Sequence, residues 1–122
     1  MLSETKKKLQ AELNNYLEGK LEFEGYYPGM NVFPSPLYKE QLQEALEFIK
    51  KENEITESSF QLYLDTIIVN MHTKVKKYKK SIYFDNENVK DIQNQGFTIP
   101  FFVDEKKGIY LLLGIVKSEI TV

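Results

Sequence analysis

Apolar residues recur at helical spacing near the start of the chain, at Leu9, Leu13, Tyr16 and Leu17. This spacing predicts a helix over residues 3–18, with Ser3 as its N-cap and Gly19 as the residue that ends it. Residues 20–27 then alternate apolar and charged side chains, which is typical of a half-buried strand, and a Pro-Gly turn closes that strand. The chain is therefore expected to begin with a helix and a strand.

Helical spacing returns twice in the middle of the chain. Residues 31–34 form a short extended segment, after which Ser35 as N-cap and Pro36 as the first helical residue begin a helix over residues 36–51. The apolar positions of this helix are Tyr38, Leu42, Ala45, Leu46 and Ile49. A third helix is predicted over residues 56–80. Its apolar positions, the strongest periodic signal in the chain, are Phe60, Leu64, Ile67, Ile68, Met71, Val75 and Tyr78.

Strand patterns follow the helices. Residues 81–84 are predicted to form a short strand, and residues 85–95 a polar, asparagine-rich connection. Residues 97–103 and 109–116 are apolar and flank a polar turn, which predicts a β-hairpin. Because Pro100 has no backbone N–H to donate, its strand is expected to lie at an edge of the sheet or to carry a bulge there.

These elements predict a single α+β domain over residues 1–122. It comprises a helix with a short strand pair, a two-helix hairpin, and a three-stranded antiparallel meander. The third helix is expected to pack one face on the sheet. The predicted contacts join Leu64, Ile67, Ile68 and Met71 of the helix to Ile99, Phe101, Leu111 and Leu113 of the strands.

Composition narrows the classes of protein to consider. The chain has 122 residues, of which 42% are hydrophobic and 28% charged, near the average of globular domains. It contains no cysteine, so disulfides, thiolate nucleophiles and cysteine-ligated zinc sites are excluded. No apolar run approaches the roughly 20 residues that span a membrane, and residues 1–10 lack a hydrophobic signal core. We therefore expect a cytoplasmic protein without membrane contact.

Charge gives the most conspicuous local feature. All 16 basic residues are lysines, set against 18 acidic residues, so the formal net charge is −2. Without arginine, the chain lacks the side chain best suited to bidentate contacts with phosphate and guanine, which disfavours a general nucleic-acid binder. Lysines nevertheless crowd around Tyr78, at Lys74, Lys76, Lys77, Lys79 and Lys80. This run either tracks phosphates beside stacking aromatic rings, or is the solvated end of a helix that complements the helix dipole.

Motifs for catalysis are absent from the sequence. The single histidine, His72, has no second histidine as a partner, so we interpret it as a surface or boundary residue rather than a metal ligand or general base. Glu22 and Glu24 share the water-facing side of the first predicted strand and indicate a solvated edge. The chain has no glycine-rich phosphate loop, nucleophile elbow or zinc-binding helix motif. No cofactor, no metal site and no identifiable catalytic residue are predicted.

Two segments carry a resemblance to a known family. NVFPSPLYKEQLQEALEFIKKEN, at residues 31–53, is similar to the strand-plus-helix opening of the RelE/ParE toxin superfamily of bacterial toxin–antitoxin modules. GFTIPFFVDEKKGIYLLLGIVKSE, at residues 96–119, is similar to the last hairpin of that family. Together with the amphipathic helix between them, the resemblance covers about residues 31–119 and leaves residues 1–30 as an N-terminal extension.

The resemblance implies a toxin that acts on translation or gyrase and is neutralised by an antitoxin. By this resemblance, Lys117 lies near the active surface. The resemblance also implies that the open sheet face is lined by Tyr83, Lys76, Lys77, Lys79 and Lys80. The arginine usual in the penultimate strand is Thr98 here, and the arginines that bind and cleave RNA have no counterpart. These departures favour a second hypothesis, a non-enzymatic interaction protein of a phage or mobile element, such as an inhibitor or immunity factor. Whether the protein is an enzyme, and its oligomeric state, stay open.

The N-terminal extension also has two interpretations. In the resembled family, an antitoxin contributes a helix and often a strand that cover the toxin. The helix predicted over residues 3–18 must bury its apolar side, because an isolated amphipathic helix of this length is marginal in water. We expect it to pack on its own domain or on a second copy, in the region that an antitoxin would use. The alternative is that it is one more layer of the core.

Overall fold

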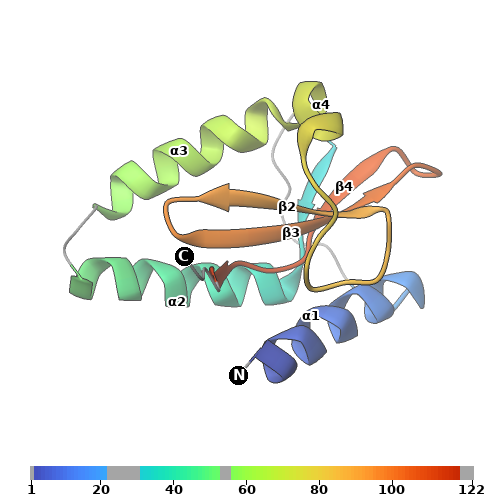
Figure 1. Cartoon of the computed structure of the whole chain (residues 1–122), viewed down its shortest axis with the longest axis horizontal. Helices are drawn as coiled ribbons and strands as arrows, with labels where there is room; N and C mark the ends of the chain where they lie inside the picture. Colours follow the sequence, from blue (N-terminus) through green and yellow to red (C-terminus); the bar gives the residue numbers. More distant parts are fainter. Residues whose placement is uncertain (1, 22–30, 53–55, 119–122) are drawn as a thin grey trace.

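The computed structural model describes residues 2–21, 31–52 and 56–118, which form a mixed α+β fold as predicted (Figure 1). Its helices are α1 (Leu2–Leu17), α2 (Pro36–Glu52), α3 (Glu57–Val69), α4 (Met71–Lys74) and the 3₁₀ turn η1 (Val75–Lys77). Its strands are β1 (Val32–Pro34), β2 (Val89–Asn94), β3 (Phe97–Asp104), β4 (Ile109–Leu112) and β5 (Val116–Lys117). The strand predicted over residues 20–27 lies almost entirely outside the described residues.

The strands form one sheet in the order β1–β4–β3–β2, and β5 pairs with β3 beyond the end of β4. β1 runs parallel to β4, whereas the other pairs are antiparallel. Since β2, β3 and β4 are consecutive and antiparallel, the predicted three-stranded meander is confirmed. The predicted two-helix hairpin corresponds to α2 and α3, which diverge from their connection in Figure 1.

The first strand of the meander lies later in the chain than predicted. Residues 81–84 are not a strand, and β2 occupies part of the polar segment that was expected to be a connection. β2 pairs with β3 along its whole length. Its two apolar residues, Val89 and Ile92, belong to opposite faces of the sheet. For that reason the strand shows no period-two pattern, and its polar composition concealed it.

α2 and α3 cover one face of the sheet. The buried residues of this cluster include the predicted contacts Leu64, Ile68, Met71, Ile99 and Phe101, while Ile67 packs against it partly buried. The predicted face of the third helix is therefore confirmed.

The other two predicted contacts, Leu111 and Leu113, lie on the opposite face of the sheet, beneath α1. The register of the β3–β4 pair explains the error, because Phe101 lies opposite Leu112. Side chains directly opposite one another share a face and neighbours along a strand alternate, so Leu112 is the residue that joins the α2–α3 cluster.

α1 covers the second face, so the expectation that the N-terminal helix packs on its own domain is confirmed. The cluster comprises Leu9, Leu13, Tyr16, Tyr83, Phe84, Val89, Phe102, Leu111 and Leu113. Glu12 Oε2 also accepts a hydrogen bond from the Leu37 N–H, at 2.6 Å, and so joins α1 to the start of α2. Gly19, with φ of 75°, ends α1 as predicted, but Leu17 is 58% exposed rather than buried.

The third predicted helix, over residues 56–80, is interrupted. Thr56 caps α3 as its Oγ1 accepts the Ser59 N–H at 3.0 Å, but α3 ends at Val69. Asn70 leaves helical geometry, with φ of −97° and ψ of 4°, and its Nδ2 donates to the Thr66 carbonyl at 2.9 Å. A short polar side chain that bonds local backbone groups competes with helix propagation, which explains the break.

Pro100 lies in β3, between β2 and β4, so its predicted edge position is wrong. The Leu113 N–H donates to the Pro100 carbonyl at 2.9 Å, but proline has no N–H to return to the Leu113 carbonyl. Ser35 Oγ donates to the Leu113 carbonyl instead, at 3.1 Å. The start of α2 thus supplies the hydrogen bond that a central strand loses at a proline.

The other alternative predicted for Pro100 was a bulge. A bulge is present, but it lies in the segment opposite Pro100 rather than in β3 itself. Phe101 lies opposite Leu112 on β4, whereas Thr98 lies opposite Val116 on β5. The register therefore shifts by one residue, and the segment 113–115 carries the extra residue of a β-bulge.

Candidate functional site

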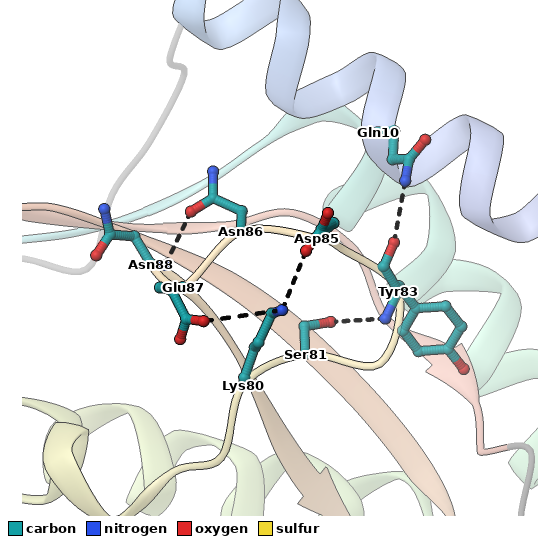
Figure 2. A network of polar contacts seen from close by, with 8 residues as sticks. All are labelled: Gln10, Lys80, Ser81, Tyr83, Asp85, Asn86, Glu87 and Asn88. Carbon is teal, nitrogen blue, oxygen red and sulfur yellow. Dashed lines mark hydrogen bonds and ion pairs between the residues drawn. The ribbon is translucent and has the colours of Figure 1, made fainter.

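The lysines singled out from the sequence lie on α4, on η1 and just after them. Lys76, Lys77 and Lys79 are exposed, and none makes an ion pair with the residues that the structure describes. Lys80 differs, because its Nζ lies 3.2 Å from an Asp85 carboxylate oxygen and 3.9 Å from one of Glu87 (Figure 2). Three free ammonium groups thus form a small basic surface before β2.

Tyr83 does not line an open sheet face, so that prediction is wrong. The residue is 0% exposed and belongs to the cluster beneath α1. Its N–H donates to Ser81 Oγ at 3.1 Å, and its carbonyl accepts from Gln10 Nε2 of α1 at 3.3 Å (Figure 2). The chain turns here instead of continuing as a strand, and this turn brings the ring under α1.

Lys117 lies apart from the other predicted site residues. Lys80 forms an isolated β-bridge with Lys90, which pairs with Phe101 in the middle of β3, whereas Lys117 pairs with Phe97 at the start of β3. The predicted lysines therefore do not converge on one site. Instead, the exposed Lys117 lines a cleft.

This cleft, of about 360 Å³, lies between α1, α2 and β5. The bulge before β5 is held against both helices, because the Ile115 N–H donates to Gln41 Oε1 of α2 at 2.9 Å. A side chain at Gly114 would collide with the ends of the Gln41 side chain and of the Leu9 side chain of α1, so a larger residue here would force both to shift. Residues from three distant parts of the sequence thus form one concavity.

The cleft has an apolar floor and a charged rim. Phe48 and Phe97 lie on the floor in an edge-to-face contact, with ring centroids 6.1 Å apart. Glu4, Lys8, Glu44 and Lys117 also line the cleft, and all four side chains are exposed. Sequence analysis singled out Lys117 among them; the others are ordinary charged positions on helices, and no local pattern marks them.

The outer face of α3 is the second feature that sequence analysis did not single out. Leu62, Tyr63 and Val69 are 65%, 53% and 54% exposed, and Leu62 and Val69 lie on the side of α3 away from the buried Phe60 and Ile68. Leu62 and Val69 are seven residues apart, so they lie on one face of the helix. That spacing was a signal in the sequence, but the stronger repeat of the buried side masked it.

Asp91 and Tyr78 are among the ionisable groups that have shifted pKa values and lie away from the cleft. Burial raises the pKa of the Asp91 carboxyl, whose Oδ2 accepts the Ile82 N–H at 3.1 Å. Burial also raises the pKa of the Tyr78 hydroxyl, whose ring packs edge-on against Phe101. Within the described residues, no three His, Cys, Asp or Glu residues gather as they would around a metal ion. His72 belongs to α4, but the structure does not describe its side chain.

Compared with protein-family models and with curated proteins, the chain matches none. In the part of the chain that the structure describes, no helix has both the length and the apolar character needed to cross a bilayer.

The geometry of the described residues offers three surfaces: the basic segment after α3, the cleft between α1, α2 and β5, and the outer face of α3.

Proposed function

We propose that this chain acts by binding another protein through the outer face of α3. Exposed fractions above one half for Leu62, Tyr63 and Val69 are the observation that supports the proposal. Large apolar side chains exposed along one helix are unfavourable in water unless a partner covers them, and contiguous apolar surfaces mark interaction sites in soluble proteins.

The polar residues on the same face favour burial as well. Thr66 Oγ1 donates to the Leu62 carbonyl at 2.9 Å, and Asn70 Nδ2 donates to the Thr66 carbonyl at 2.9 Å. Because these groups already have partners within the helix, covering them with a protein leaves few polar atoms unsatisfied. Ser59, Thr66 and Asn70 are uncharged, but the exposed Asp65 lies between Leu62 and Val69 on this face, so a partner that covers the face would have to pair with its carboxylate.

The test is a pair of exposed-to-charged variants. Leu62→Lys combined with Val69→Lys should abolish retention of a copurifying protein and should weaken its binding, measured with the purified partner, by at least about tenfold. Ile82→Lys is the matched control, because Ile82 is 63% exposed but lies in the loop before β2. Unchanged affinity of the double variant would exclude the outer face of α3 as the binding surface.

A second function, a RelE/ParE-like toxin or a protein derived from one, is favoured by the order of the elements. The strand and helix β1 and α2, the helix α3 and the closing strands β3 and β4 follow the order on which the resemblance rests, with α4, η1 and β2 between α3 and β3. The free Lys76, Lys77 and Lys79 would be the contact to nucleic acid or to another target, with Lys117 on a separate surface. Such a toxin would also need a protein partner as its antitoxin.

Induced expression in bacteria tests this second function. Growth arrest that a neighbouring small open reading frame relieves would support a toxin, whereas harmless expression would count against it. Changing Lys76, Lys77 and Lys79 to Gln should remove the arrest and any salt-sensitive nucleic-acid binding. Lys80→Gln is the control, because carboxylates already engage that ammonium group.

A further inference from the structure

The cleft between α1, α2 and β5 combines an apolar floor with unpaired charges of both signs. The Lys117 ammonium lies 4.0 Å from the centroid of the Phe48 ring, so a cation stands directly over the floor. Glu44 precedes Phe48 by one helical turn on α2, which places its side chain beside the same ring. An acidic and a basic side chain therefore flank one aromatic surface.

The α1 wall of the cleft repeats this combination. Glu4 and Lys8 lie one turn apart on α1, and both line the cleft. Within the described residues, neither these two nor Glu44 and Lys117 form an ion pair. Each wall thus presents to a ligand one carboxylate and one ammonium group that have no ion-pair partner among the described residues.

We propose that this cleft binds an apolar α-amino acid. The carboxylate would draw the Lys117 ammonium away from the Phe48 ring, the large side chain would pack on the ring so uncovered and on Phe97, and the ammonium group of the ligand would meet Glu44. A zwitterion satisfies both signs of charge at once, whereas a purely anionic or cationic ligand would face a like charge on each wall. A volume of about 360 Å³ lies at the small end of ligand sites, as a single amino acid requires.

The inference is independent of the proposed protein binding, because the cleft and the outer face of α3 belong to different elements. The Leu62→Lys, Val69→Lys variant should leave amino-acid binding unchanged. A negative result for amino-acid binding therefore does not contradict the proposed protein binding, and the reverse also holds.

Calorimetric titration of the full chain with L-phenylalanine tests the proposal. N-acetyl-phenylalanine lacks the ammonium group, phenylalanine amide lacks the carboxylate, and N-acetyl-phenylalanine amide lacks both. Phenylalanine should bind. Removing either charge, by N-acetylation or by amidation, should weaken binding by about tenfold, which is the contribution of one charge-assisted hydrogen bond to affinity. Equal binding of N-acetyl-phenylalanine amide would overturn the proposal and would identify the cleft as a pocket for an apolar side chain of a partner protein.

Variants assign the two charges. Lys117→Gln should remove the preference for a free carboxylate, and Glu44→Gln should remove the preference for a free ammonium group. Thr5→Phe, which adds bulk to the cleft from a half-buried position of α1, should abolish binding, whereas Lys76→Gln outside the cleft should change nothing. Absence of binding by the unaltered chain, or unchanged selectivity in both charge variants, would overturn the proposal.

Discussion

At the scale of single residues, the two sides of α3 differ in how far their apolar side chains are exposed to solvent. Ile68 is 0% exposed between the sheet and α2, whereas Leu62 on the same helix is 65% exposed. Both are large aliphatic residues, so side-chain chemistry does not distinguish them; only the packing around each one does. This contrast allows a matched measurement of what burial contributes.

Ile68→Ala should lower the free energy of unfolding by about 2–4 kcal/mol, because it removes buried methyl groups and leaves a cavity. Leu62→Ala should change it by less than about 0.5 kcal/mol. Urea unfolding followed by far-UV circular dichroism measures both. Similar midpoints for the two variants would mean that α3 presents a different face to the sheet.

Tyr16 links α1 to the end of β3. Its hydroxyl donates to Asp104 Oδ2 at 2.5 Å, and its ring packs edge-on against Phe102. Burial, followed by the hydrogen bond to Asp104, raises the pKa of the Tyr16 hydroxyl. The same hydrogen bond is the main cause that lowers the pKa of the Asp104 carboxyl below its usual value.

A pH-dependent contribution to stability follows from Asp104. Because its pKa is lower in the folded chain than in the unfolded one, the ionised carboxylate stabilises the fold above about pH 4, and this stabilisation is lost as the pH falls further. Tyr16→Phe keeps the ring packing, should reduce stability by about 1 kcal/mol at neutral pH, and should flatten the decline below pH 4. Unfolding curves at neutral and acidic pH measure this, and parallel pH profiles of the two proteins would contradict the assignment.

At the scale of elements, the N-cap residues of α2 and α3 have different structural roles. Thr56 caps α3 in water, through one hydrogen bond to the Ser59 N–H. Ser35 is buried, and its Oγ both accepts the Tyr38 N–H at 3.2 Å and donates to the Leu113 carbonyl at 3.1 Å. One hydroxyl thus caps α2 and completes the sheet beside Pro100.

Ser35→Ala should therefore destabilise the protein more than Thr56→Ala does. The first change leaves a buried N–H and a buried carbonyl unsatisfied and should remove about 2–3 kcal/mol, whereas an exposed cap contributes about 1 kcal/mol. Chemical denaturation of the two variants gives the comparison. If the two losses were equal, the bond from Ser35 to the strand would contribute nothing to stability.

At the scale of the whole molecule, α1 holds the fold together as one layer over the second face of the sheet. Leu9, Leu13 and Tyr16 are at most 6% exposed, and they cover Leu111 and Leu113. The hydrogen bond from Leu37 to Glu12 and the collision that a larger residue at position 114 would cause with Leu9 show how closely α1 fits.

Deletion of residues 1–20 should therefore leave a chain that no longer unfolds cooperatively and that aggregates, because the apolar face beneath α1 becomes exposed. Far-UV circular dichroism with a thermal melt, together with light scattering, measures this outcome. A soluble, folded remainder that gains toxicity or a new partner would instead support a removable cap in the position of an antitoxin.

Local signals in the sequence determined the α+β class, the helix starts at Ser35 and Thr56, the end of α1 at Gly19, and the α3 side that faces the core. These features depend on spacing, caps and turn residues that act within a few positions. The tertiary structure decided the rest. The pairing with β3 made a polar segment into β2, the β3–β4 register placed Leu112 rather than its neighbours beside α3, and packing beneath α1 buried Tyr83. The cleft joins α1, α2 and β5, and no local pattern predicts it, because contacts between distant segments bring its charges together.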